Sequence, residues 1–313
     1  MTNSQLKTPV AFIIFRRPDT TERVFETIRQ AKPPKLLVVA DGPRNDRPGE
    51  AEKCAATRAI IDRVDWDCEV LKNYSQENLG CGRRVASGLS WVFDQVEEAI
   101  ILEDDCLPHL SFFRFCEELL ERYRYDERIA TISAQNGQFG RRRTDYSYYF
   151  SRYFHSWGWA SWRRAWQYYD FDMKLWPEIR ERGFLQDILE DSHAVKVWTE
   201  VFQSNYEFGT KPGVIDTWDY KWIFYCWVQN GLSICPKVKL VSNIGYGEGA
   251  THTTSGKNPY INSPVEAIDF PLKHPPFVIR DQQADNLTQF IVHDYDRSFL
   301  NRAKRQIIKL FKS

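Results

Sequence analysis

Neither sign of charge is in excess in this sequence. Lys plus Arg and Asp plus Glu both number 42 in 313 residues, so the formal net charge at pH 7 is +0. Proteins that bind nucleic acid usually carry a basic surplus on the binding domain. The composition therefore argues against nucleic acid as a partner and requires any charge-based function to be local.

Long apolar runs and paired cysteine motifs are also missing. No stretch approaches the roughly 18 apolar residues of a membrane-spanning helix. Residues 1–15 lack the apolar core and small-residue cleavage site of a signal peptide. The seven cysteines are an odd number without CxxC spacing, which is untypical of a disulfide framework or a zinc site. We expect a reduced, cytoplasmic protein that does not span a membrane.

Glycine-rich phosphate loops are absent too. The first apolar run leads into FRRP at 15–18 rather than into G-x-G-x-x-G, and GxxxxGK[ST] occurs nowhere in the chain. Both motifs use glycines so that the backbone can approach a phosphate closely. A diphosphate ligand would therefore have to be held by a carboxylate-bound metal instead of a glycine-rich loop.

Aromatic side chains, in contrast, are abundant. They make up 15% of the chain and include 11 Trp, a content suited to stacking on planar bases or on the apolar faces of sugars. For any single tryptophan, burial in the core is the better interpretation. Trp162 and Trp166 are therefore interpreted as core residues.

Short apolar runs alternate with amphipathic segments through the first 133 residues. The apolar runs predict strands at 10–15, 35–40, 68–71, 98–102 and 129–133. The periodic segments predict helices at 20–31, with Thr20 or Thr21 as N-cap, and at 52–64, 84–96 and 112–123. This alternation predicts an α/β fold with a mostly parallel central sheet flanked by helices. Helical patches follow near 161–170 and 184–204.

Three adjacent carboxylates, Glu103, Asp104 and Asp105, directly follow the fourth predicted strand. In an open α/β sheet, ligands bind beyond the carboxyl ends of the strands. Mg²⁺ and Mn²⁺ use one or two protein carboxylates together with phosphate oxygens and water. The motif therefore predicts a divalent-metal site, although a solvated loop is the more common role of such a tripeptide.

Six segments in a fixed order resemble glycosyltransferases of the GT-A type, in particular bacterial sugar transferases distantly similar to the N-acetylglucosaminyltransferase I group. These segments are FRRPD at 15–19, the strand ending at Asp41, NLG at 78–80, IILEDD at 100–105, SWGW at 156–159 and TWD at 217–219. The resemblance implies a single GT-A domain over 1–270, with a nucleotide-sugar-binding half at 1–110 and an acceptor-binding half at 111–270. Residues 271–313 are then a C-terminal extension.

The resemblance also implies roles for individual residues. Asp105 would hold the metal, Mn²⁺ or Mg²⁺. The nucleotide-sugar donor would lie against Arg16, Arg17, Asp41, Asn78, Gly80, Arg83, Glu103 and Asp104. One of the two neighbouring arginines would reach the base. Asp219 resembles the general base of an inverting displacement, and Trp218 precedes the acceptor site.

The surroundings of Asp219 allow two interpretations. The residue lies between Trp218 and Tyr220, whose rings would partly shield a carboxylate from water, and a base within reach of an acceptor hydroxyl contributes about 10²–10⁴-fold in rate. Alternatively, Asp219 or Asp216 caps a helix that begins near Lys221, because aspartate is a favoured N-cap residue.

Two further segments have the composition of a ligand site. Trp157, Gly158 and Trp159 are predicted to form a wall of the acceptor site with Trp218, because a small residue between indoles lets a sugar ring lie against them. The glycine-rich run at 245–252 ends in His252, which is either a metal or phosphate contact or a structural histidine.

Residues 297–313 have apolar side chains on one helical face and five Lys or Arg mostly off it. This pattern is typical of an interfacial helix on an anionic membrane surface, or equally of a helix docked on its own domain.

The sequence thus predicts an inverting, metal-dependent transferase that moves a sugar from a UDP-sugar to a hydroxyl of a glycan or lipid-linked glycan, as in surface polysaccharide synthesis. Its place would be the cytoplasm, in peripheral contact with the inner face of the cell membrane. The alternatives are a metal-dependent phosphohydrolase or nucleotidyltransferase, and a non-catalytic glycan-binding protein.

Overall fold

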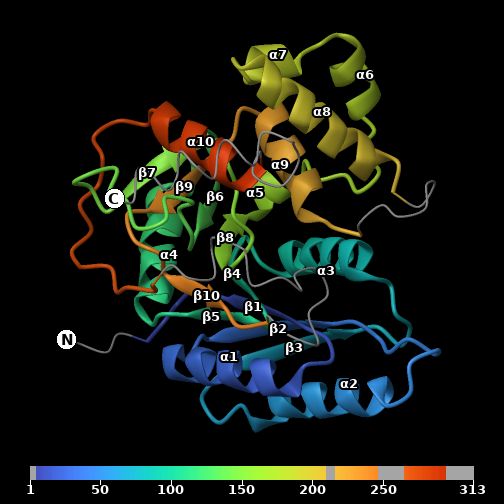
Figure 1. Cartoon of the computed structure of the whole chain (residues 1–313). Coiled ribbons are helices and arrows are strands. Elements are labelled where there is room, and N and C mark those ends of the chain that lie inside the picture. The colour runs from blue at the N-terminus through green and yellow to red at the C-terminus, as the bar shows by residue number, and fades with distance from the viewer. Residues whose placement is uncertain (1–4, 209–215, 246–263, 294–313) are drawn as a thin grey trace, which may run out of the picture.

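The computed structural model describes residues 5–208, 216–245 and 264–293. They are built around an eight-stranded sheet of order β3-β2-β1-β4-β8-β6-β9-β7 (Figure 1). Its strands are β1 (Val10–Ile14), β2 (Lys35–Ala40), β3 (Glu69–Tyr74), β4 (Glu98–Glu103), β6 (Ile129–Ser133), β7 (Tyr148–Ser151), β8 (Trp159–Trp162) and β9 (Leu232–Pro236). A separate antiparallel pair, β5 (Cys106–Pro108) and β10 (Val241–Asn243), follows the acidic motif.

The direction of the strands decides which residues share an edge of the sheet. Strands β3, β2, β1 and β4 are parallel neighbours, and β6 is parallel to β9. Strand β8 runs antiparallel to both β4 and β6, which therefore point the same way, and β7 is antiparallel to β9. The carboxyl ends of β1, β2, β4, β6 and β9 thus lie at one edge.

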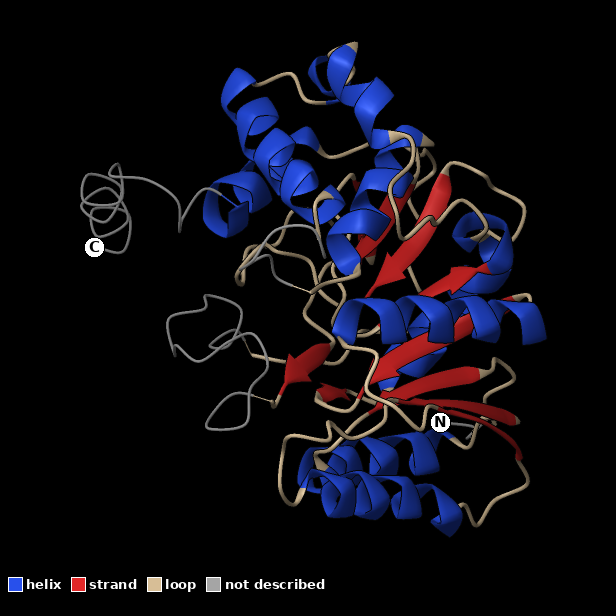
Figure 2. Ribbon diagram, turned by 90° about the vertical axis from the view of Figure 1, so that its right-hand side faces the viewer, coloured by secondary structure: helices blue, strands red, loops and turns tan. Residues whose placement is uncertain are grey.

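Helices cover both faces of the sheet (Figures 1 and 2). The longer ones are α1 (Pro18–Ala31), α2 (Glu50–Ala59), α3 (Cys81–Gln95), α4 (Ser111–Arg122), α8 (Ser192–Tyr206) and α9 (Asp219–Val228). Shorter ones are α5 (Arg163–Trp166), α6 (Trp176–Glu181), α7 (Leu185–Ile188) and α10 (Gln282–Thr288). The predicted α/β fold with a mostly parallel sheet between helices is confirmed.

The alternation of side chains along the strands divides the core in two. In β1, Val10, Phe12 and Ile14 pack with α1 and α4, whereas Ala11 and Ile13 face the cluster formed with α3, α8 and α9. This period of two is expected of a strand buried on both faces. The second cluster is the more aromatic one and takes up most of the tryptophans.

Two local predictions are wrong. Helix α1 begins at Pro18, not at Thr20 or Thr21, with Arg17 as N-cap, because the fixed φ of proline suits the first position of a helix. The helical patch predicted near 161–170 is reduced to α5, because Trp159–Trp162 is strand β8 between β4 and β6. A short apolar run cannot be assigned to helix or strand by periodicity alone.

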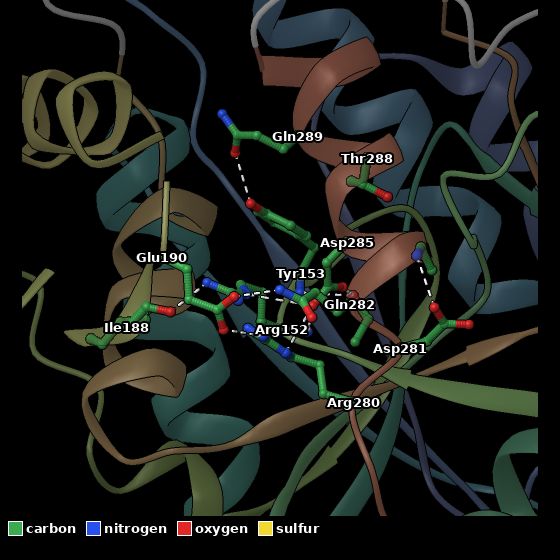
Figure 3. Close-up of polar contacts among 12 residues, drawn as sticks. Arg152, Tyr153, Ile188, Glu190, Arg280, Asp281, Gln282, Asp285, Thr288 and Gln289 are labelled. Atoms are coloured by element: carbon green, nitrogen blue, oxygen red, sulfur yellow. Dashed lines mark hydrogen bonds and ion pairs between the residues drawn. The ribbon is translucent and has the colours of Figure 1, made fainter. Parts of the chain in front are cut away.

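The described part of the predicted C-terminal extension is attached to the sheet and the upper helices by a polar network (Figure 3). Asp285 of α10 accepts a hydrogen bond from the Ser151 hydroxyl at 2.5 Å. Its Oδ2 atom lies 3.4 Å from Arg152 Nε and 3.6 Å from Arg280 Nε. Burial nevertheless raises the pKa of Asp285 to about 6. The predicted interfacial helix at 297–313 lies outside the described residues.

Within the described ranges, no helix combines the length and the apolar character needed to cross a bilayer.

Candidate functional site

The acidic motif lies at the carboxyl end of β4, at the edge where β1 and β2 also end. Glu103 is the last residue of the strand, and Asp104 and Asp105 follow it in a turn. The neighbouring strand β1 leads into Arg17, the N-cap of α1. The topology therefore brings together two segments that are 88 residues apart in the sequence.

Arg17 is the cation that faces the motif. Its Nη1 atom donates to Asp105 Oδ2 at 2.6 Å and lies 3.9 Å from Asp104 Oδ1. The other oxygen of Asp104 accepts from the Phe15 backbone N–H at 3.1 Å. Asp104 is thus tied to the end of β1, whereas the side-chain contacts of Asp105 within the described part of the chain are the Arg17 ion pair and a weak thiol contact from Cys106 at 3.5 Å.

Burial perturbs the titration of the motif. Desolvation, together with the charges of Asp105, Asp104 and Asp219, raises the pKa of Glu103 well above its usual range. Desolvation and Asp105 raise the pKa of Asp104 to about 7, against the opposing charge of Arg17. Burial by itself lowers the pKa of Arg17, but the neighbouring carboxylates raise it overall. The charges of Arg17 and Arg16 oppose the raised pKa of Asp104 without cancelling it, and such perturbed groups are typical of functional sites.

Asp219 belongs to the same electrostatic environment, because its charge contributes to the raised pKa of Glu103. It is the first residue of α9, one position after the N-cap residue Trp218. Its Oδ1 atom accepts from the Tyr220 backbone N–H at 2.9 Å and from the Thr217 hydroxyl. Its Oδ2 atom accepts a longer bond, 3.4 Å, from the Ser156 hydroxyl. The carboxylate is therefore held in one orientation from two separate segments.

Asp216 occupies the amino terminus of α3. Its Oδ1 atom accepts from the Gly82 backbone N–H at 3.0 Å. A Cβ atom at Gly80 would lie 2.3 Å from Asp216 Oδ2, and one at Gly82 would lie 2.2 Å from Oδ1. Asp216 thus contacts the start of α3, and the N-cap residue of α9 is Trp218. The sequence signal for its true position was the G-x-G pattern at 80–82, which lets a carboxylate approach the backbone.

Asp41 and Asn78 are brought together at the end of β2. Asp41 Oδ2 accepts from Asn78 Nδ2 at 3.0 Å, and Oδ1 accepts from the backbone N–H groups of Gly42 and Leu79, both at 2.9 Å. Burial raises the pKa of Asp41 despite these donors. The pair fixes the loop that leads into α3 and the Asp216 contact.

Arg16 and Arg83 each have a partner outside the acidic motif, although the charge of Arg16 also acts on the pKa of Asp104. Arg16 pairs with Glu50 of α2 at 2.9 Å, and Glu50 also accepts from Arg44. The guanidinium of Arg83 lies over the ring of Phe171, 4.9 Å from its centroid. Of the two neighbouring arginines proposed to reach the base, Arg17 is the one directed at the carboxylates.

The residues predicted to form the acceptor wall differ in exposure: some are buried in the core and one is partly exposed. Trp159 and Trp218 are 0% and 3% exposed and stack on each other at 5.6 Å. Neither ring offers a surface to a sugar, which corrects the prediction for these two residues. Gly158 adopts φ 65° and packs near Leu102, and Trp157 is the one partly exposed indole of the segment. Trp157 therefore remains the candidate for an acceptor contact.

Gly245, the first residue of the glycine-rich run, lies directly against the Arg17–Asp105 pair. A Cβ atom here would come within 2.2 Å of Asp105 Oδ2 and 2.5 Å of Arg17 Nη1. The Asn243 side chain accepts from the Gly245 N–H at 2.8 Å and holds it there. His252, predicted as a metal ligand, lies outside the described residues.

The donor set around Asp105 fits one kind of metal site. Over residues 5–208, 216–245 and 264–293, no group of three or more His, Cys, Asp or Glu side chains is arranged to hold an ion. Mg²⁺ and related ions need few protein ligands when phosphate oxygens and water complete the shell. The described residues thus fit an ion held by Asp105 and a diphosphate better than a cage made by these residues alone.

Comparison with known proteins gives weak likenesses. No protein-family model and no curated protein match this sequence. Mouse xyloside xylosyltransferase 1, in its apo form, aligns with a TM-score of 0.32 and 12% identity over 70% of this chain and 81% of that one. UDP-glucose pyrophosphorylase complexed with UDP-glucose aligns with a TM-score of 0.36 and 9% identity over 76% of this chain and 94% of that one. Likeness of this degree assigns neither activity nor ligand, so function must be argued from the site.

Proposed function

We propose that this chain is a metal-dependent glycosyltransferase of the GT-A type, which moves a sugar from a UDP-sugar to a glycan hydroxyl with inversion. The observation that supports this best is the placement of two separate acidic groups in one site. Asp105 follows β4 beside Arg17, and Asp219 begins α9 within electrostatic reach of Glu103. One can serve the donor and the other the acceptor.

On the donor side, Asp105 would hold Mn²⁺ or Mg²⁺, which neutralises charge on the departing diphosphate. Arg17, already 2.6 Å from Asp105 Oδ2, can donate to diphosphate oxygens from the same position. The loop fixed by Asp41 and Asn78 follows β2, the strand next to β1. There it can form a wall of the nucleoside site. Gly245 lets the backbone pass close to these groups.

On the acceptor side, Asp219 would accept the proton of the attacking hydroxyl. The acceptor oxygen bonds to the anomeric carbon, the bond from that carbon to the diphosphate oxygen breaks, and the proton ends on the Asp219 carboxylate. The Thr217 hydroxyl and the Tyr220 N–H orient Oδ1. Among the residues that the structure describes, the Ser156 hydroxyl donates to Oδ2 over a long 3.4 Å, so an acceptor hydroxyl can replace it.

A thermal-shift panel tests the donor class. UDP, GDP, dTDP and CMP are each added with and without Mn²⁺, since a ligand at about 100 times its dissociation constant stabilises by about 2.7 kcal/mol. We expect a shift with UDP that grows with Mn²⁺. No shift with any nucleotide would contradict the proposal.

A product assay without acceptor separates the alternatives. A phosphohydrolase or nucleotidyltransferase would consume the nucleotide sugar by itself, and a glycan-binding protein would bind glycan with no nucleotide requirement. The proposed transferase consumes the donor at a substantial rate only when a glycan or lipid-linked glycan acceptor is added.

A further inference from the structure

Helix α3 has a glycine at its N-cap position. This residue, Gly80, offers no side chain to the helix, and no acidic residue lies in the first turn. The first N–H groups of a helix have no partner within it and favour a nearby negative charge. Asp216, 134 positions away from Gly82 in the sequence, supplies that charge, because its Oδ1 atom accepts from the Gly82 N–H at 3.0 Å. The cap of α3 therefore comes from the segment that leads into α9.

The start of α3 leaves space for this carboxylate. A Cβ atom at Gly80 or Gly82 would lie within 2.3 Å of an Asp216 oxygen. At Gly82 it would also lie 3.2 Å from the Thr217 carbonyl oxygen. Gly80 has φ 80°, which favours glycine whatever the space, whereas the φ of Gly82 lies outside the left-handed region. At Gly82 it is thus the contact with Asp216 and Thr217, and not the backbone conformation, that requires glycine.

Asp216 and Asp219 lie at the two ends of one short segment. The Thr217 hydroxyl between them donates to Asp219 Oδ1. Trp218 is buried, and its carbonyl oxygen accepts from the Tyr169 hydroxyl at 3.3 Å. Trp218 therefore fixes the segment to the upper core, while Asp216 fixes it to α3.

The start of α3 belongs to the donor side of the site. The Leu79 N–H, just before the helix, donates to Asp41 Oδ1 at 2.9 Å, so the loop held at the end of β2 leads directly into α3. Burial raises the pKa of the thiol of Cys81, the first residue of α3, and so do four nearby carboxylates, those of Glu103, Asp219, Asp216 and Asp105. Helix α3 thus begins between the carboxylates assigned to the donor and the one assigned to the acceptor.

We propose that Asp216 is a positioning residue for Asp219. By capping α3, it holds the segment of the proposed base at a fixed distance from the loop that would bind the donor. This step rests on the proposed transferase function. Displacement of a reacting group by about 1 Å can lower a rate by about 10²-fold. A contact that sets this distance therefore affects transfer without touching donor or acceptor.

Transfer is measured on the full-length protein as Mn²⁺-dependent UDP release. The donors are UDP-glucose, UDP-galactose and UDP-N-acetylglucosamine, and the acceptors are octyl glycosides of the same three sugars. With the most active pair, we expect Asp216→Ala to lower kcat by about 10–10²-fold and to leave KM for the UDP-sugar within about twofold. Asp216→Asn should keep most of the rate, because its amide oxygen can still accept from the Gly82 N–H. Asp187→Ala changes an exposed aspartate of α7 and is the matched control.

A double-mutant cycle separates positioning from stability. If Asp216 acts through Asp219, Asp216→Ala should have little effect on the slow residual transfer of Asp219→Asn, because no base remains to be positioned. Gly82→Ala should lower transfer in the unaltered protein, since its methyl group displaces the carboxylate, but should add little to Asp216→Ala. If Asp216→Ala does not fold, Gly82→Ala combined with Asp219→Asn makes the same comparison.

Two results would overturn the inference. One is a kcat of Asp216→Ala equal to that of Asp187→Ala. The other is an equal loss of transfer from Asp216→Ala with and without the Asp219 carboxylate, which would show a structural role alone. If no donor and acceptor pair releases UDP, the proposed function and this inference fall together. If Asp219→Asn removes transfer and Asp216→Ala does not lower it, this inference falls and the proposed function stands.

Discussion

The carboxyl groups at the end of β4 and the indoles of the upper helical layer are both partly or fully shielded from water, and this shielding acts on them in opposite directions. It raises the pKa of Glu103 and Asp104 despite the opposing charge of Arg17. It stabilises the tryptophan layer, which we define as Trp159, Trp166, Trp218 and Trp222, whose rings contact one another in the second core cluster. Shielding carboxyl groups from water costs free energy and occurs at the candidate site. Burying tryptophan rings lowers the free energy and stabilises the scaffold that holds the site.

Asp219 lies between these two regions. Its replacement by asparagine should have the largest effect of the changes considered, on the rate of sugar transfer. Asp219→Asn keeps the shape of the side chain but cannot accept the acceptor proton. We expect transfer to fall by about 10²–10⁴-fold, with UDP affinity unchanged, as measured by single-turnover product formation and by calorimetry. An unchanged transfer rate would show that Asp219 belongs to the scaffold alone.

Truncation within the tryptophan layer should instead reduce stability. Trp159→Ala removes a fully buried ring between Phe154 and Trp218, and such changes cost about 3–5 kcal/mol. Denaturant unfolding measures the loss. Trp157→Ala, at the partly exposed neighbour, should cost much less stability while weakening acceptor binding. If both variants lost the same amount of stability, Trp157 would be a core residue like Trp159 and not part of an acceptor site.

His155 should make the free energy of unfolding depend on pH. Burial lowers the pKa of His155 from 6.5 to about 4. A histidine with a lowered pKa favours the folded state when neutral, so its contribution is present above pH 6.5 and is lost as the pH falls towards 4. The loss is at most about 3 kcal/mol. Unfolding measured from pH 7 to 4 should show a smaller decline in His155→Gln than in the unaltered protein; parallel declines would exclude His155 as the cause.

Of the changes at Asp219, Trp159, His155 and Gly245, the change at Gly245 should have the smallest effect in free energy. In Gly245→Ala the added methyl group would meet Asp105 Oδ2 at 2.2 Å and Arg17 Nη1 at 2.5 Å, so the pair must shift. We expect about tenfold weaker metal-dependent UDP binding, equivalent to about 1.4 kcal/mol, with little loss of stability. Unaltered UDP affinity would place Gly245 outside the site.

Most of the first half of the fold could be predicted from the sequence because β1, β2, β4 and β6 are mainly apolar runs; β3, which reads EVLKNY, is the exception and extends beyond the predicted 68–71. The runs at 35–40 and 129–133 match β2 and β6 residue for residue. The acidic motif was placed at a strand end by the same reasoning, and the structure puts it there.

The second half could not be predicted in this way, because aromatic rings are placed by contacts between distant segments. Strand β8 reads WASW, which has no signal separating it from a helix or a loop, and only its pairing with β4 and β6 defines it. The position of Asp216 at the amino terminus of α3 joins residues 134 positions apart.

The most direct test of the account is a titration of Asp105→Asn with UDP in the presence and absence of Mn²⁺. Asparagine keeps the size of the side chain but removes the charge that pairs with Arg17 and would hold the ion. We predict that the unaltered protein binds UDP at least tenfold more tightly with Mn²⁺ than without it, and that Asp105→Asn loses this difference. An Asp105→Asn protein that keeps the full Mn²⁺ effect would contradict the assignment of Asp105 as the metal-holding residue.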